Sequence, residues 1–192
     1  KYFANHPRSL VNYAKSNKKQ WENNVVEMEK KLDDFLSIFK IAKKPVIRYQ
    51  DGDKGLKNIY MESLESKTEI LSIAEMEGWD TPEFKKWGQE YNRERSKRKI
   101  KERMLLLDTK QARKWMKNYK GNLKYTEYRW IKQEQLPGIE DLGGEINIFE
   151  DKVLMALNKK PNRMGVVIQS EPLTKLLKTL FELAWQVGKP VQ

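Results

Sequence analysis

The sequence predicts an α/β protein in which a long N-terminal coiled-coil helix precedes a layered α/β domain. A heptad repeat of apolar residues runs through the first forty-odd residues, and strand and helix patterns alternate after Pro45. A run of strands followed by an amphipathic helix then completes the pattern. We therefore expect a dimerising coiled-coil helix over residues 1–44 and an α/β domain over residues 45–192.

The heptad repeat predicts that two copies of the N-terminal helix pair with each other. Apolar residues step alternately by four and by three, which is the period of about 3.5 residues of a left-handed coiled coil. The a positions are Val11, Lys18, Val25, Leu32 and Phe39, and the d positions are Ala14, Trp21, Met28, Phe35 and Ala42. A helix with this stripe cannot bury it alone, so we expect a homodimer.

Strand and helix patterns alternate after Pro45, which ends the first helix. The patterns predict strands at residues 46–49, 68–76, 103–108 and 123–131, and helices within residues 50–66, after Thr81 and at residues 109–119. Thr81 is a good helix N-cap, and Pro82 suits the first helical position. The apolar run "RMLLLD" is typical of a parallel strand that is buried on both faces.

The last part of the chain predicts three strands and a closing helix. The strands are "EINIFE", "KVLMALN" and "MGVVIQS", and the first two flank a turn at residues 150–152. The helix begins near Pro172, and its apolar side holds Leu173, Leu176, Leu177, Leu180, Phe181 and Ala184. We interpret this side as core, because it is broader than the seam of a coiled coil.

Composition limits the chemistry that is available. The sequence holds no cysteine and one histidine, His6, so disulfides, thiolate metal sites and multi-histidine metal centres are excluded, and we expect no metal and no cofactor. It has no apolar run of about 18 residues, so we expect no membrane span, and the absence of cysteine fits a cytoplasmic protein. The net charge of +11 is compatible with a nucleic-acid partner, but the basic stretch at residues 85–103 also fits a solvated helix face.

Two groups of polar residues are candidates for ligand binding. Glu75, Glu77 and Trp79 follow a predicted strand, where α/β sheets place their ligands, and such side chains suit a polyhydroxyl compound. Glu145 and Asn147 alternate on a strand and so point to one face. The alternative for both groups is plain exposure to solvent. The sequence shows no phosphate-binding glycine loop and no nucleophile elbow.

The chain resembles the TrmB-type transcriptional regulators over nearly its whole length. The opening "KYFANHPRSLVNYAKSNKKQWENN" is similar to the segment that follows their winged helix and leads into a dimerising helix. The stretches "VIRYQDGDKGLKNIYMESLES", "TEILSIAEM", "GEINIFEDKVLMAL", "GVVIQS" and "LLKTLFELAW" are similar to their effector domain. The resemblance implies a phospholipase-D-like α/β domain, a small-molecule effector such as a sugar, and operator DNA bound through an N-terminal winged helix.

The same resemblance raises the question of phosphodiesterase chemistry, because phospholipase-D enzymes use a His-x-Lys-x-x-x-x-Asp motif. Aligned with that motif, this chain has Gly143, Glu145 and Glu150 where the histidine, lysine and aspartate stand. Covalent phosphoryl transfer needs the histidine nucleophile, and the one histidine of the sequence lies before the heptads. We therefore expect that the domain is not an enzyme.

These observations support one leading hypothesis and two alternatives. The leading hypothesis is an effector-sensing and dimerisation fragment of a DNA-binding transcriptional regulator. Because the chain begins at Lys1 without a methionine, we expect a winged helix of about 70–80 residues upstream. The alternatives are a protein that binds nucleic acid directly through residues 85–103, and a structural dimerisation module without a ligand.

Overall fold

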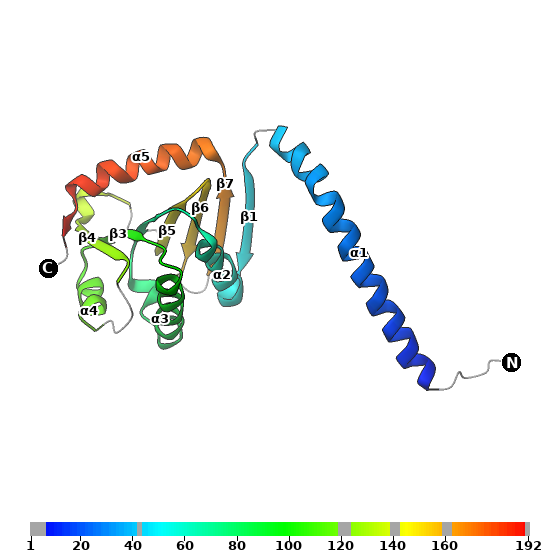
Figure 1. Cartoon of the computed structure of the whole chain (residues 1–192). Helices are drawn as coiled ribbons and strands as arrows, with labels where there is room; N and C mark the ends of the chain where they lie inside the picture. Colours follow the sequence, from blue (N-terminus) through cyan, green and yellow to red (C-terminus); the bar gives the residue numbers. More distant parts are fainter. Residues whose placement is uncertain (1–6, 42–43, 119–123, 139–142, 159–162, 191–192) are drawn as a thin grey trace. The chain divides into compact units, whose positions relative to one another are not determined.

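Figure 1 shows the protein as a computed structural model, which describes residues 7–41, 44–118, 124–138, 143–158 and 163–190, with the backbone alone over residues 33–41. The chain divides into two compact units, residues 1–44 and residues 45–192. No helix among these described residues is long and apolar enough to cross a membrane.

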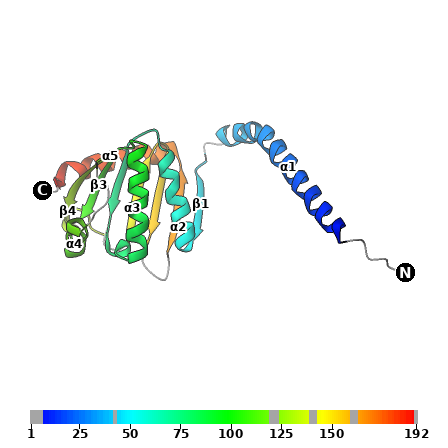
Figure 2. The ribbon, with the colours of Figure 1, turned by 60° about the horizontal axis from the view of Figure 1, so that its bottom comes forward.

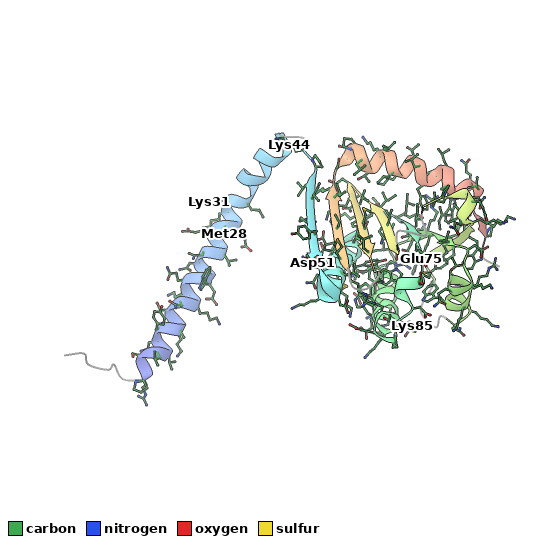
Figure 3. The ribbon with its side chains drawn as sticks, turned by 180° about the vertical axis from the view of Figure 1, so that it is seen from behind. Met28, Lys31, Lys44, Asp51, Glu75 and Lys85 are labelled. Atoms are coloured by element: carbon green, nitrogen blue, oxygen red, sulfur yellow. The ribbon has the colours of Figure 1, made fainter. Side chains whose placement is uncertain are left out.

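The first unit is the helix α1, Arg8–Ile41. Every described side chain of the predicted seam is exposed, from Val11 to Leu32, and Met28 and Lys31 project from the helix in Figure 3. The side chains of Phe35 and Phe39 and the whole of Ala42 lie outside the described residues. The single chain therefore leaves this apolar stripe uncovered.

The second unit is built on one mixed sheet of eight strands, whose order is β1-β7-β6-β5-β2-β3-β4-β8. The strands are β1 Val46–Asp51, β2 Ile70–Ala74, β3 Glu102–Leu107, β4 Thr126–Ile131, β5 Gly144–Phe149, β6 Lys152–Leu157, β7 Met164–Gln169 and β8 Lys189–Pro190. Strands β2, β3 and β4 are parallel, and β5 joins β2 in the antiparallel sense, with Glu145 beside Ala74 and Asn147 beside Ser72.

Helices cover both faces of the sheet (Figures 1 and 2). The helices are α2 Gly52–Met61, α3 Pro82–Lys97, α4 Lys110–Asn118 and α5 Glu171–Val187, with short 3-10 turns η1 Glu62–Glu65, η2 Glu77–Trp79 and η3 Gln133–Gln135. Alternation along β3 divides the core: Met104 and Leu106 pack with α2, α3 and α4, whereas Leu105 packs with α5. Thr81 caps α3 as predicted, because its hydroxyl accepts from the Phe84 amide at 3.4 Å.

The predicted fold class is confirmed: a long helix precedes a layered α/β domain, and the predicted strands and helices of the domain are present. The short edge strand β8 was not predicted, since two residues carry no alternation pattern.

The predicted core stripe of α5 needs correction. Leu176 and Leu180 were predicted to face the core, but they are 56% and 50% exposed. The buried face is narrower and runs through Thr174, Phe181 and Trp185, because the sheet contacts only one side of the helix.

A pair of glycine variants tests the packing of β5 on β6. A Cβ atom at Gly144 would lie 1.7 Å from the Ala156 carbonyl oxygen, so Gly144→Ala must push the two strands apart. At Gly88, inside α3, a Cβ atom meets nothing within 4 Å. In urea unfolding, Gly144→Ala should lower the free energy of unfolding by about 3 kcal/mol, whereas Gly88→Ala should raise it by about 0.5–1 kcal/mol. Equal stabilities of the two variants would contradict this packing.

Candidate functional site

The candidate site is a cavity of about 60 Å³ between the sheet and the helices α2, α3 and α4, which we call the aromatic pocket. Its lining consists mainly of aromatic rings, together with two carboxylates and one lysine. The lining residues are Tyr60, Met76, Trp79, Phe84, Lys85, Trp87, Gly88, Tyr91, Asn92, Glu102, Met104, Trp115, Tyr128 and Glu145.

The helix α3 supplies three of the aromatic rings that line the aromatic pocket. Because Pro82 and the Thr81 cap fix where the helix begins, Phe84, Trp87 and Tyr91 follow at helical spacing and share one face. The Trp87 ring stacks on Trp79 of η2, with ring centroids 5.9 Å apart and an interplanar angle of 12°. Edge contacts to Tyr60 complete a cluster whose rings hold one another in place.

Beneath the rings, buried polar side chains cross the sheet in a line that we call the polar row: Glu145 and Asn147 on β5, Ser72 on β2, Glu102 on β3 and Arg95 on α3. The Ser72 hydroxyl lies 2.6 Å from Asn147 Oδ1 and 2.9 Å from Glu102 Oε1. Alternation places Glu145 and Asn147 on the same sheet face as the aromatic cluster, so they are buried and not solvated.

Arg95 and Glu102 form a buried ion pair at one end of the polar row. The distance from Arg95 Nη2 to Glu102 Oε2 is 3.2 Å, and the side chains are 0% and 3% exposed. Arg95 also donates to the Ile100 carbonyl oxygen at 2.7 Å and to the Thr126 hydroxyl. The charge of Glu102 is thus balanced within the protein itself.

Glu145 is the carboxyl at the other end of the row, and its charge has no comparable partner. It is 4% exposed, and its Oε1 atom accepts no hydrogen bond among the described residues. Burial, reinforced by the nearby charge of Glu102, raises the pKa of Glu145 to about 8, although Tyr60, Asn147 and Arg95 act in the opposite direction. Burial likewise raises the pKa of the Tyr60 hydroxyl well above its usual value.

Trp79 leaves a second hydrogen-bonding group unused in the aromatic pocket. Its indole Nε1 is buried and has no acceptor among the described residues. Buried polar atoms are nearly always paired, so an unused donor and an unused acceptor in one cavity are the arrangement that a bound ligand would satisfy.

The five predicted ligand residues take three different positions. Trp79 and Glu145 line the aromatic pocket. Glu75, labelled in Figure 3, and Asn147 are buried beside it without lining it. Glu77 is exposed, and its backbone amide donates to Glu75 Oε1 at 2.7 Å.

Sequence reasoning missed most of the ring residues that line the pocket, namely Tyr60, Trp87, Tyr91, Trp115 and Tyr128. The spacing of Phe84, Trp87 and Tyr91 was visible as a helix face, but an aromatic face reads equally well as core. Glu102 lies within the basic stretch at residues 85–103, so its sequence context did not indicate a buried carboxyl. Only the pairing of β2 with β3 brings it to Ser72.

The basic stretch at residues 85–103 is a solvated face only in part. Arg95 is buried, whereas Lys97 and Arg98 lie on the surface and pair with Glu94. Arg103 is held by Glu69 and Glu182. The exposed basic side chains of this stretch are Lys85, Lys86, Arg93, Lys97, Arg98, Lys99 and Lys101.

The three positions aligned with the phosphodiesterase motif have structural partners. The Gly143 carbonyl oxygen accepts from the Asn158 amide at 2.9 Å, and a Glu150 carboxylate oxygen accepts from the Lys67 amide at 2.9 Å. Glu145 lies between them in the chain and enters the aromatic pocket. Within the described ranges, no three carboxylate or histidine side chains gather where they could hold a metal ion.

No protein-family model matches the chain, and no curated protein sequence matches it. Among solved structures, TrmBL2, an archaeal chromatin protein, has a TM-score of 0.53 at 16% identity, covering 99% of this chain and 73% of the other. Nuc from Salmonella typhimurium, a phospholipase D family member, has a TM-score of 0.52 at 14% identity, covering 78% and 99%. NucT from Helicobacter pylori has a TM-score of 0.52 at 8% identity, covering 77% and 100%. These likenesses support the TrmB-like and phospholipase-D-like fold.

A Glu145→Gln variant tests the burial of this carboxyl through the pH dependence of stability. Between its usual pKa of 4.5 and about 8, the unfolded state releases the Glu145 proton while the folded state retains it, so stability at this site falls as pH rises. The slope approaches about 1.4 kcal/mol per pH unit. Glutamine cannot ionise, so the stability gain of Glu145→Gln should grow from pH 5 to pH 8 and then level off in urea unfolding. A pH-independent difference would contradict the assignment.

Proposed function

We propose that this chain is the dimerising and effector-sensing part of a DNA-binding transcriptional regulator that acts in the cytoplasm and is not an enzyme. The exposed heptad seam of α1 carries the proposal. In the single chain Val25, Met28 and Leu32 are 52%, 70% and 52% exposed, and other apolar side chains of the helix are similarly uncovered. An apolar stripe with this period is the surface that a second α1 helix covers in a coiled-coil homodimer.

The fold likeness to TrmBL2 supports the DNA-binding part of the proposal, because that protein is described as a chromatin protein with a novel mode of DNA binding. In our proposal, operator DNA is bound through a winged helix that precedes residue 1. The paired α1 helices would then set the spacing of two DNA-reading helices, which has to match the spacing of two operator half-sites.

The aromatic pocket supports the effector-sensing part. It offers an unused acceptor on Glu145 and an unused donor on Trp79, which a small-molecule effector would engage. An effector that binds one conformation of the dimer more tightly shifts the population toward it, which is how a bound ligand would change the spacing of the DNA-reading helices.

The chemistry of the motif positions supports a domain without catalysis. Gly143 has no side chain to attack phosphorus, and Glu145 presents a carboxyl where an electrophilic lysine would be needed. The buried Glu145 would also repel a phosphodiester whenever it is ionised.

A second candidate function, direct nucleic-acid binding, is favoured by the exposed basic side chains between Lys85 and Lys101. It predicts that the isolated chain binds DNA or RNA in a gel-shift assay at low salt. If the isolated chain does not slow the migration of DNA or RNA in the gel at low salt, direct nucleic-acid binding is excluded.

A third candidate, a ligand-free dimerisation module, is favoured by the exposed stripe of Leu176, Leu180, Leu183 and Val187 on α5. These residues are spaced by four, three and four, so α5 also offers a surface to a second copy.

Two charge substitutions distinguish the α1 seam from the α5 stripe as the dimer interface. Light scattering of the full chain should give twice the mass of one chain. Val25→Glu places a charge in the α1 seam and should produce a monomer, because a buried unpaired carboxylate opposes association. The matched variant Leu180→Glu, on α5, should remain dimeric. A monomeric wild-type chain, or a monomer formed by Leu180→Glu alone, would contradict the proposed dimer.

A further inference from the structure

We propose that the aromatic pocket binds a small organic ammonium ion, whose positive charge lies against Glu145 and among the surrounding rings. The inference deepens the proposed function by naming the chemical class of the effector, and it rests on the proposal that the α/β domain senses one. Its geometric basis is a cavity with aromatic walls and a buried acceptor, Glu145 Oε1, that no described residue engages.

The size of the cavity favours a small ion over a sugar. A cavity needs a volume of about 10–15 Å³ to hold one water molecule. A cavity of about 60 Å³ therefore holds about four to six water-sized groups. A methylated ammonium headgroup fits this room, whereas a hexose ring with its hydroxyl groups exceeds it.

Of the two carboxylates that line the cavity, Glu145 is the one with no ion-pair partner among the described residues. The Arg95 guanidinium, itself fully buried, balances Glu102 at 3.2 Å. Lys85 at the rim forms an ion pair with Asp80. An incoming cation would therefore form the ion pair that Glu145 lacks among the described residues, which favours an ammonium ion over an anion or a neutral polyol.

Aromatic walls favour a cation because the face of each ring carries negative charge density. The Phe84 ring already holds two of the protein's own cations, Lys57 at 5.1 Å and Arg163 at 4.4 Å from its centroid. Tyr60, Trp79 and Trp87 line the cavity, and no cation of the described residues is placed over them. The unused indole Nε1 of Trp79 adds a donor for an oxygen atom elsewhere on the ligand.

Binding of a cation should be coupled to release of the Glu145 proton. The titratable groups that face Glu145 are Tyr60 from α2, Tyr91 and Arg95 from α3, and Glu102 from β3. Burial raises the pKa of both tyrosines, so they stay neutral near neutral pH. The affinity for an ammonium ion should therefore increase with pH until Glu145 is ionised and then level off near pH 8.

The test uses tetramethylammonium chloride as the probe, with the full chain and the indole N–H resonances of Trp79 and Trp87 as the readout. Saturable shifts should appear in the wild-type chain. The affinity for tetramethylammonium obtained from them should be lower at pH 6 than at pH 8 by about tenfold or more. tert-Butanol has the same number of non-hydrogen atoms and no charge, so it should give no saturable shift. Sodium chloride at equal ionic strength controls for screening.

Glu145→Gln should lower the affinity for tetramethylammonium by about tenfold or more and should remove its pH dependence. Glu90→Gln, an exposed carboxylate on the same helix as Trp87, is the matched control and should bind like the wild type. Circular dichroism establishes that both variants are folded.

Three outcomes would overturn the inference: no binding of tetramethylammonium to the wild type, equal binding of tert-butanol, or unchanged binding to a folded Glu145→Gln variant. Saturable shifts with glucose in place of tetramethylammonium would overturn the ammonium class while leaving an effector-sensing domain in place. Failure of the proposed dimer would be seen separately, as a monomer in light scattering.

Discussion

The buried ion pair between Arg95 and Glu102 is the interaction on which the rest of the domain depends. Arg95 joins the last turn of α3 to β3 through Glu102 and to β4 through Thr126, so it fixes the helix over the sheet. Removing one partner of such a pair costs about 3–5 kcal/mol, because the other charge stays buried. The position of α3 in turn sets the position of the Trp87 and Tyr91 rings over the polar row.

The same arrangement leaves Glu145 in a surrounding that disfavours its charge. Arg95 neutralises Glu102, whereas Glu145 at the opposite end of the row is buried and has no ion-pair partner among the described residues. A carboxyl kept in this state lowers the stability of the fold near neutral pH. A buried carboxyl that lowers stability and has an unused acceptor atom is typical of a binding pocket. The proposed ligand would supply the missing positive charge.

The architecture could be predicted from the sequence because its signals are local. The heptads of α1, the Thr81-Pro82 start of α3 and the apolar run of β3 each fall within a short window. The site could not be predicted in the same way, since Glu102 and Glu145 are brought together only by the pairing of β2 with β3 and β5, and Tyr60 reaches them from α2. On α5 the periodicity indicated an apolar helix, but the width of the buried face depends on the shape of the sheet beneath it, so Leu176 and Leu180 were misplaced.

The central claim is that the carboxyl of Glu145 is held neutral under the aromatic cluster until a cation reaches it. The most direct measurement is the titration of the Glu145 side-chain carboxyl carbon by NMR in the unliganded full chain. The structure predicts a midpoint near 8, well above the ordinary value of 4.5, because the group is buried beside Glu102. A midpoint close to 4.5 would contradict the claim, since it would mean that Glu145 is solvated or already neutralised.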